Sequence, residues 1–305
     1  MIGLQYTLEN QNGESIVIND HTTNPNQIIA LQQYPQFDVD IKNSELPREG
    51  QHGIWDFFSF YGRRVTSFQG VIVGASELDV ETVKNQLMKV LAFGSQPQSG
   101  NDGSVLVKWT DIENKSWQIS GKLMNPIQFN RSMKQNFRLD FNFSLKSADP
   151  FIVSQSLINT VGVRGYTSAG AMFPITLPLT IGTVNINELT VNNIGSADAE
   201  TIIRIYGEDQ GDITNPKVRN LTTGEFIQID TVITGSTHYI EINSKEGTVV
   251  DQDGLDLSGD ITTDSSFIHL KAGENLMFYT SDEDPLITLE LPTALFTVKF
   301  RSTKI

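Results

Sequence analysis

The sequence predicts a mainly β protein of two domains, with one helix in the first domain. Most segments alternate apolar and polar side chains with a period of two, which is typical of a strand that buries one face. Residues 79–93 break that alternation with a helical spacing. A proline and a Gly/Ser-rich stretch near the middle divide the 305 residues into two halves. Each half is long enough to bury a core of its own.

Residues 137–145 form the clearest predicted strand. Every second residue is apolar, in the order Phe137, Leu139, Phe141, Phe143 and Leu145. The same alternation predicts strands at residues 105–109, 117–123, 202–206, 239–242 and 295–300. Turn residues that accept positive φ angles bound these segments, at Asn12-Gly13, Asn101-Asp102-Gly103 and Asp253-Gly254. The chain is therefore predicted to be predominantly β.

Residues 79–93 are predicted to form the single substantial helix. Apolar residues recur there at helical spacing, at positions Val80, Val83, Leu87, Val90 and Leu91. Asp79 is expected to cap the N-terminus, and Gly94 is expected to end the helix. Leu78 and Val83 fit a hydrophobic staple across that N-terminus. One helix packed on a sheet gives the first half an α+β character.

The domain boundary is predicted just after Asp149-Pro150, which gives domains at residues 1–150 and 151–305. Proline cannot continue a β ladder, and the Gly/Ser-rich residues 161–172 follow it. After the boundary, short strand-like runs recur at the turn spacing typical of a β-sandwich.

Composition limits the classes of partner. The formal net charge is −14: residues 1–150 hold 13 basic and 16 acidic side chains, whereas residues 151–305 hold 9 and 20. Tight binding to nucleic acid needs clustered lysine and arginine, so this balance argues against a protein that grips DNA. An acidic surface instead lets DNA slide past without sticking. Because the chain has no cysteine, disulfides and thiolate metal sites are excluded.

No membrane segment is expected. No run approaches the roughly 18 apolar residues that a spanning helix needs. The first residues lack the basic and apolar regions of a signal peptide. We therefore expect synthesis and assembly in the cytoplasm.

Acidic clusters give the only hints of metal or catalytic chemistry, and their spacing fits neither. The loop at residues 251–256 places Gly254 fourth rather than sixth and lacks the closing Glu of a calcium-binding EF-hand loop. A solvated hairpin tip is the better interpretation. Residues 282–285 form a dense acidic turn, but neighbouring side chains on one turn do not face each other across a sugar as glycosidase carboxylates do.

Nucleophilic and metal-assisted catalysis also lack candidate groups. No Gly-x-Ser-x-Gly motif occurs, and no histidine has a partner at i,i+4 among His21, His52, His238 and His269. The sequence therefore predicts a protein that is not an enzyme and has no metal or cofactor.

Carbohydrate binding stays open as an alternative function, because exposed aromatics on a β-sandwich can stack on sugar rings. The aromatics considered in the second half are Tyr166, Tyr206, Phe226, Tyr239, Phe267, Phe278 and Tyr279. Most lie in alternating segments, where the core is the usual place for them. A β-sandwich glycosidase is a third and weaker hypothesis.

Tyr61-Gly62-Arg63-Arg64 is the most distinctive local motif. Adjacent arginines in a strand point to opposite faces, so at least one should leave the core and pair with a carboxylate. That carboxylate belongs either to the same chain or to a neighbouring subunit, and both interpretations stay open.

The order and spacing of several segments resemble the siphophage distal tail protein family over the whole chain. In the first half the resemblance is carried by GLQYTLENQNGESIVIND at residues 3–20, GIW at 53–55, FYGRRV at 60–65, FQGVI at 68–72 and Asp149-Pro150-Phe151. In the second half it is carried by NNIG at 192–195, TIIRI at 201–205, NLTTGE at 220–225, Gly235, YIEIN at 239–243 and FIHLKAGEN at 267–275. No large module interrupts this order, so the carbohydrate-binding insertions of some relatives are not expected here.

The resemblance implies a ring-forming, tail-tube-like β-barrel or sandwich with one packed helix at residues 1–150, and a galectin-like β-sandwich at residues 151–305. It implies a structural hub of the tail tip or baseplate, with six copies in a ring around a channel for DNA. The implied partners are the major tail tube protein, the tail-associated fibre or lysin protein, and receptor-binding proteins. The protein would then reside in the virion. The candidate ring interface comprises Tyr61, Gly62, Arg63, Arg64, Phe68 and Gln69.

Overall fold

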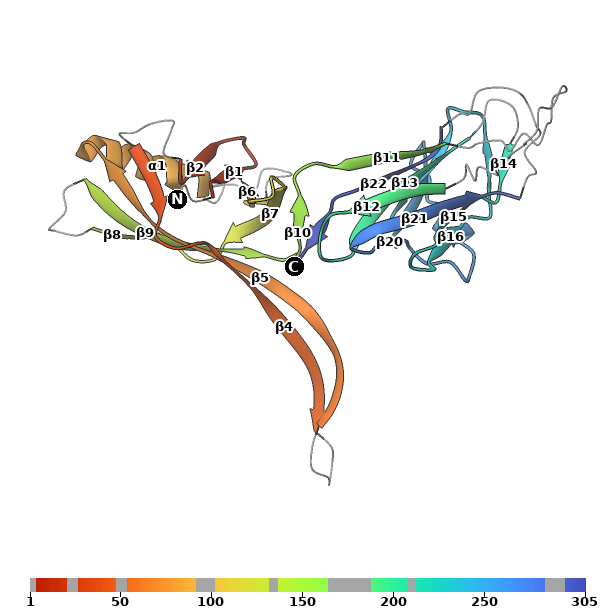
Figure 1. Cartoon of the computed structure of the whole chain (residues 1–305), viewed down its shortest axis with the longest axis horizontal. Helices are drawn as coiled ribbons and strands as arrows, with labels where there is room; N and C mark the ends of the chain where they lie inside the picture. Colours follow the sequence, from red (N-terminus) through yellow and green to blue (C-terminus); the bar gives the residue numbers. More distant parts are fainter. Residues whose placement is uncertain are drawn as a thin grey trace, which may run out of the picture. The chain divides into compact units, whose positions relative to one another are not determined.

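A computed structural model describes residues 4–20, 27–47, 54–91, 102–131, 137–163, 188–207, 212–282 and 294–305. The chain divides into two compact units, Met1–Gln155 together with Ile305, and Ser156–Lys304. Both units are built of β-strands, and the described residues contain one α-helix (Figure 1). The predicted fold class, mainly β with a helix in the first half, is confirmed. No helix among these residues is long and apolar enough to cross a membrane.

The first unit is a curved antiparallel sheet. Its main path has the spatial order β2 (Ser15–Ile18), β1 (Tyr6–Asn10), β6 (Val105–Thr110), β7 (Ser116–Leu123), β9 (Arg138–Ser147), β5 (Ile54–Gly74) and β3 (Gln27–Leu31). Three strands join at its margins: β4 (Gln36–Pro47) pairs with β5, β8 (Gln128–Asn130) with β9, and β10 (Ile152–Ser154) with β7. Alternate side chains point inward and share one core, which includes Leu8, Phe68, Trp109, Phe141 and Leu145. The alternation in the sequence thus becomes the inner face of a barrel-like sheet.

Asn19 ties the two ends of this path together. It follows β2 in a left-handed conformation with φ of 64°, which asparagine tolerates better than most residues. Its backbone N–H donates to the Ile29 carbonyl at 2.7 Å, and its side chain accepts the Leu31 N–H at 2.7 Å. Its side-chain amide also donates to the Leu4 carbonyl at 3.0 Å. These bonds link β2 to β3, so the sheet is a nearly closed barrel.

The helix α1 spans Glu77–Leu91 and packs on the barrel core. The predicted apolar face is confirmed, because the buried residues of the helix are Val80, Val83, Leu87, Val90 and Leu91. This face repeats at helical spacing and therefore buries one continuous stripe.

The predicted N-terminus of the helix is wrong. Ser76 Oγ accepts the Asp79 N–H at 3.2 Å and donates to the Asp79 carboxylate at 2.7 Å, which makes a capping box with Ser76 as the cap. The Ser76 hydroxyl, followed by the Gln27 amide, lowers the pKa of Asp79. Leu78 lies inside the helix with 76% of its surface exposed, so the predicted staple with Val83 is wrong as well. Gly94 lies outside the described residues.

Phe137 also departs from its predicted place. The strand β9 begins one residue later, and Phe137 adopts a left-handed φ of 61° with its side chain 40% exposed. The other predicted inward residues of this strand are buried, namely Leu139, Phe141, Phe143 and Leu145. The turn before the strand, rather than the alternation, therefore decides where Phe137 points.

The second unit is a β-sandwich, as predicted. One sheet has the order β11 (Ile158–Val163), β22 (Ala294–Phe300), β13 (Ala199–Tyr206), β18 (Tyr239–Asn243) and β19 (Thr248–Asp251), and β20 (His269–Leu270) also pairs with β13. The other has the order β12 (Glu188–Asn193), β21 (Gly273–Thr280), β15 (Lys217–Asn220) and β16 (Phe226–Gln228). Ile203 and Val298 of the first sheet share one core cluster with Val218 and Met277 of the second. The two sheets therefore pack face to face.

Smaller elements complete the second unit. They are the pair β14 (Asp212–Thr214) and β17 (Val232–Thr234), the 3-10 helix η1 (Ser258–Asp260), and β23 (Thr303–Lys304). The predicted likeness of this unit to galectins stays a prediction.

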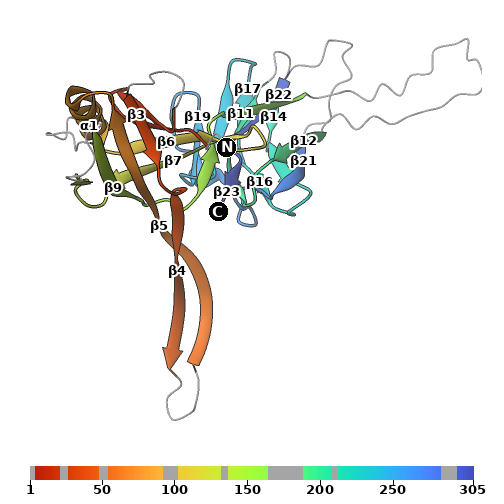
Figure 2. The ribbon, with the colours of Figure 1, turned by 60° about the vertical axis from the view of Figure 1, so that its left-hand side comes forward.

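The strands β4 and β5 continue beyond the barrel as a two-stranded ribbon, which both views show leaving the first unit (Figures 1 and 2). We call the part that projects, residues 41–47 of β4 and 54–61 of β5, the β4–β5 arm. Its two strands pair with each other from Ile41 opposite Tyr61 to Pro47 opposite Ile54.

Candidate assembly site at the root of the arm

The β4–β5 arm has open strand edges. The pairing of β5 with β9 begins only at Arg64 opposite Ser147, so in the described structure residues 54–63 of β5 pair with β4 alone. Among the described strands, β4 pairs with β5 alone. Unpaired N–H and C=O groups along such edges can pair with another chain. The arm therefore offers backbone edges for assembly.

A register shift marks the point where the arm leaves the barrel. Val39 lies opposite Arg64, but Ile41 lies opposite Tyr61, so Gly62 and Arg63 together face Asp40. Such a bulge bends the ribbon locally. A Cβ at Gly62 would lie 3.1 Å from Asp40 Cβ and 3.2 Å from the Asp40 carbonyl oxygen, which is tighter than ordinary contact. Glycine therefore allows the two strands to approach closely at this bend.

Arg64 anchors the root of the arm from inside the barrel. Its side chain is 2% exposed, and its Nε donates to the Pro150 carbonyl at 2.5 Å while Nη1 donates to the Phe37 carbonyl at 3.1 Å. Its Nη2 has no protein partner among the described residues. Burial lowers the pKa of this guanidinium. The two most distinctive sequence landmarks, the Tyr-Gly-Arg-Arg motif and Asp149-Pro150, are thus in direct contact.

A second contact joins the same landmarks. The Tyr61 ring packs edge-on against the Phe151 ring, with centroids 6.3 Å apart and planes at 75°. Phe151 is positioned by the Asp149 carboxylate, which accepts its backbone N–H at 3.0 Å. Half of the Tyr61 surface, 50%, remains exposed. The end of the first unit therefore supports the root of the arm at both Tyr61 and Arg64.

The six predicted interface residues separate into an outward and an inward set. Tyr61, Arg63 and Gln69 are exposed, whereas Gly62, Arg64 and Phe68 are buried within this chain. Arg63 donates from Nε to Asp40 Oδ2 at 2.8 Å, so its carboxylate partner lies in the same chain. Their role in a ring stays a prediction.

The buried members act through the fold of their own subunit. Phe68 stacks on Phe143 with centroids 5.0 Å apart and meets Tyr6 edge-on at 6.1 Å. Gln69 belongs to the outward set, and its side chain accepts a hydrogen bond from the Gln33 amide at 3.2 Å. A direct side-chain contact with a neighbour is therefore open only to the outward set.

Sequence reasoning missed the arm itself. Ile41 and Phe60 lie on opposite faces of the ribbon, and their side chains are 64% and 61% exposed. The signal available in the sequence was the length of the apolar-rich run at residues 54–74, which is several times longer than a mean strand of about 5–6 residues. A strand of that length must extend beyond the sheet in which it begins.

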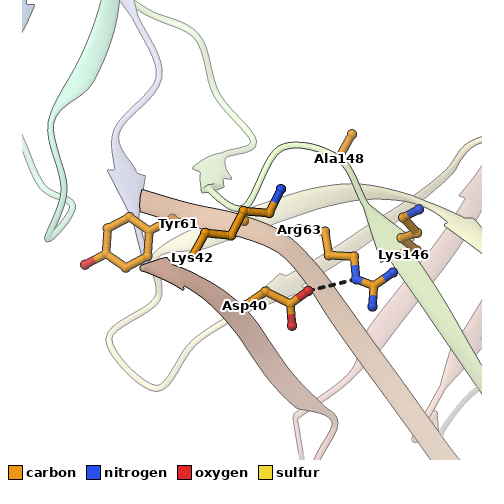
Figure 3. Close-up of a pocket in the computed structure, with 7 residues that line it drawn as sticks. Asp40, Lys42, Tyr61, Arg63, Lys146 and Ala148 are labelled. Atoms are coloured by element: carbon orange, nitrogen blue, oxygen red, sulfur yellow. Dashed lines mark hydrogen bonds and ion pairs between the residues drawn. The ribbon is translucent and has the colours of Figure 1, made fainter. Parts of the chain in front are cut away.

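The root of the arm also borders an open hollow of about 580 Å³. It is lined by Asp40, Lys42, Tyr61, Gly62, Arg63, Lys146 and Ala148, all of which belong to the first unit (Figure 3). Three of these side chains are cationic and one is a carboxylate. The hollow therefore has a basic lining in a chain whose net charge is −14.

The acidic loop at residues 251–256 is a self-capped turn. The Asp251 carboxylate accepts the backbone N–H of Asp253 at 2.9 Å and of Leu255 at 2.8 Å, and Gly254 has a φ of 83°. Within the described part of the chain, no three His, Cys, Asp or Glu residues gather in a way that could hold a metal ion.

The aromatics of the second unit do not form an exposed platform in the part that the structure describes. Tyr206 and Tyr239 are half-buried and pack on each other with centroids 5.9 Å apart, while the Arg204 guanidinium lies 4.7 Å from the Tyr239 ring centroid. Phe226, Phe267 and Phe278 are half-buried, Tyr279 is buried, and Tyr166 lies outside the described residues. No specific observation therefore favours stacking on a sugar.

Comparison with known proteins points to phage tails. Residues 195–290 match the family model described as the siphovirus-type tail component, C-terminal domain. The crystal structure of the Dit protein of phage SPP1, described as a paradigm of the hub adsorption apparatus in phages that infect Gram-positive bacteria, matches with a TM-score of 0.60 and 12% identity over 98% of this chain and 99% of that chain. At this identity the likeness shows a shared fold.

Weaker matches come from a second phage. The phage P2 baseplate in its activated conformation with calcium matches with a TM-score of 0.45 and 12% identity, covering 98% of each chain. The strontium form matches with a TM-score of 0.45 and 13% identity over 97% of this chain and 98% of that chain. A sequence comparison with curated proteins gives no match.

Proposed function

We propose, from the premise that this chain is a siphophage distal tail protein with the family's C-terminal domain at residues 195–290, that six copies form a ring at the end of the tail tube. The chain is a structural component of the tail tip or baseplate, and it resides in the virion. The ring is built by the first unit and joins the tail tube to the proteins below it. Its action is mechanical: it holds neighbouring tail proteins in place.

The β4–β5 arm is the observation that carries this proposal. A two-stranded ribbon with open edges cannot bury its own apolar side chains, and an isolated hairpin is marginally stable in water. In the single chain, the side chains of Ile41 and Phe60 are more than half exposed, and that of Tyr61 is half exposed. In a ring, each arm would cover these side chains against the next subunit. Such a contact is heterologous and closes by rotation, which is the geometry that a ring needs.

The remaining partners follow from the position of such a ring. The major tail tube protein would bind on one side, the tail-associated fibre or lysin protein on the other, and receptor-binding proteins at the periphery. DNA would pass through the central channel without specific binding, because a net charge of −14 repels its phosphates.

Replacing the exposed apolar residues of the arm tests this proposal. The variant Ile41→Ser/Phe60→Ser should lose the assembled species in native mass spectrometry and light scattering, whereas the unmodified chain should show six times the monomer mass. A matched control is Leu78→Ser/Ile112→Ser, which removes two side chains that are 76% and 91% exposed and lie outside the arm. A wild-type chain that stays monomeric at high concentration would contradict a self-assembling ring. A ring that persists in the arm variant would contradict the arm as its interface, and so would a ring lost equally in the arm variant and the control.

A further inference from the structure

The basic hollow at the root of the arm contains two lysines that form no ion pair with the residues that the structure describes. Lys42 and Lys146 lie on the two sides of Arg63 (Figure 3). Asp40 is the single carboxylate in the lining, and its Oδ2 already accepts from Arg63 Nε at 2.8 Å. Neither lysine forms an ion pair within the described part of the chain. Among the described residues, the hollow therefore presents two ammonium groups without an ion-pair partner beside Arg63, whose side chain is 46% exposed.

These two lysines differ from the other described lysines of the first unit. The others each pair with a carboxylate, in the combinations Lys84–Glu81, Lys89–Glu14, Lys108–Glu9, Lys115–Glu113 and Lys122–Asp102. Within the first unit, the two described lysines that form no ion pair therefore lie together in one hollow, which favours a partner from outside the subunit.

The surroundings favour a protein partner over a phosphate polymer. Tyr61 lines the hollow, and the exposed Ile41 and Phe60 flank it on the arm. Aromatic residues and arginine are enriched at protein interfaces, and Tyr61 and Arg63 both line this hollow. A second copy of this chain supplies carboxylates in excess, with 36 acidic and 22 basic side chains.

We infer that the basic hollow of Lys42, Arg63 and Lys146 receives a carboxylate-bearing segment of a second copy of this chain. This inference rests on the proposed ring and names the chemistry of one of its contacts. A concave basic surface focuses the field that attracts an acidic segment, and the two lysines fix the orientation of the incoming subunit. Because these cations border solvent, salt screens them, and the ring should weaken as ionic strength rises above about 0.1 M, where the screening length falls below about 10 Å.

The variant Lys42→Glu/Lys146→Glu tests the inference. This variant reverses the charge of the hollow without changing the barrel core. In native mass spectrometry and light scattering, its ring should dissociate at a protein concentration at least about tenfold higher than that of the wild type. A tenfold change corresponds to about 1.4 kcal/mol. The matched control Lys245→Glu/Lys271→Glu makes the same change in net charge on the second unit and should leave the ring unchanged. The milder variant Lys42→Gln/Lys146→Gln should weaken the ring less and flatten its dependence on salt. Far-UV circular dichroism and thermal unfolding should show that every variant is folded.

Three outcomes would overturn the inference. If wild-type rings form and the charge-reversed variant assembles at the same concentration with the same salt dependence, the hollow makes no contact and only this inference fails. If the wild-type chain stays monomeric, the proposed ring fails with it. If inorganic polyphosphate binds the wild type but not the charge-reversed variant, and both form the same rings, then the hollow is a phosphate site rather than a carboxylate site.

Discussion

Replacing Arg64 by methionine should destabilise the first unit far more than the same replacement of its neighbour Arg63. The two arginines are adjacent in β5 but point to opposite faces, one into the barrel and one to solvent. Methionine keeps the length of the apolar stem and removes the guanidinium. The comparison therefore isolates the polar contacts of a buried arginine from those of an exposed one.

The structure sets the expected magnitude. Arg64 makes two charge-assisted hydrogen bonds, at 2.5 Å to Pro150 and 3.1 Å to Phe37, and such bonds contribute about 1.5–3 kcal/mol each. The replacement also removes the buried Nη2, which has no protein partner among the described residues, and so the desolvation cost of that group is recovered. This gain offsets part of the loss of the two hydrogen bonds. The net loss in the free energy of unfolding is therefore expected at about 2–4 kcal/mol. Arg63 forms an exposed ion pair with Asp40, which contributes about 0–1 kcal/mol.

Tryptophan fluorescence during urea unfolding of the full chain measures this difference. All three tryptophans of the chain lie in the first unit, and two of them, Trp109 and Trp117, are buried, so the signal reports that unit alone. Equal losses for Arg64→Met and Arg63→Met would refute the reasoning. The same burial means that charge reversal at both arginines, a natural first test of the ring, would unfold the barrel as well and could not isolate the interface.

Two further changes probe the barrel. Asn19→Ala should lower the free energy of unfolding by about 2–4 kcal/mol, from two side-chain hydrogen bonds of about 1 kcal/mol each and the cost of a left-handed backbone. Asn19→Gly should cost less, because glycine accepts that backbone conformation. Equal urea midpoints for Asn19→Ala and the wild type would contradict a stabilising role for the Asn19 link between β2 and β3. Burial, and secondarily the Tyr34 phenol, raises the pKa of Tyr6 to about 12. Since the folded value lies above the unfolded value of about 10, the stability contributed by protonated Tyr6 is complete below about pH 10 and is lost as the pH rises towards 12. Tyr6→Phe should flatten the fall in tryptophan-detected stability over that window, and an unchanged fall would contradict this origin.

Local patterns determined the elements that depend on one face of burial. The alternation at residues 105–109, 117–123 and 139–145 and the helical spacing of Val80 to Leu91 correspond to buried faces in the structure. These patterns are readable because the period of a strand or helix decides which side chains can be buried together. The ends of the elements were less readable. Ser76, rather than Asp79, caps the helix, because its hydroxyl accepts the Asp79 N–H and donates to the Asp79 carboxylate.

What the sequence determined by itself was the class of protein: a mainly β chain with one helix, no cysteine chemistry, and a tail-protein order of segments. What only the tertiary structure decided was which arginine is an anchor, that the motif at Tyr61 meets the chain at Pro150, and that Lys42 and Lys146 line one hollow and form no ion pair with the described residues. The physical reason is distance along the chain. Periodicity is set by neighbours a few residues apart, whereas Arg64 and Pro150, 86 residues apart, meet only after the barrel has folded.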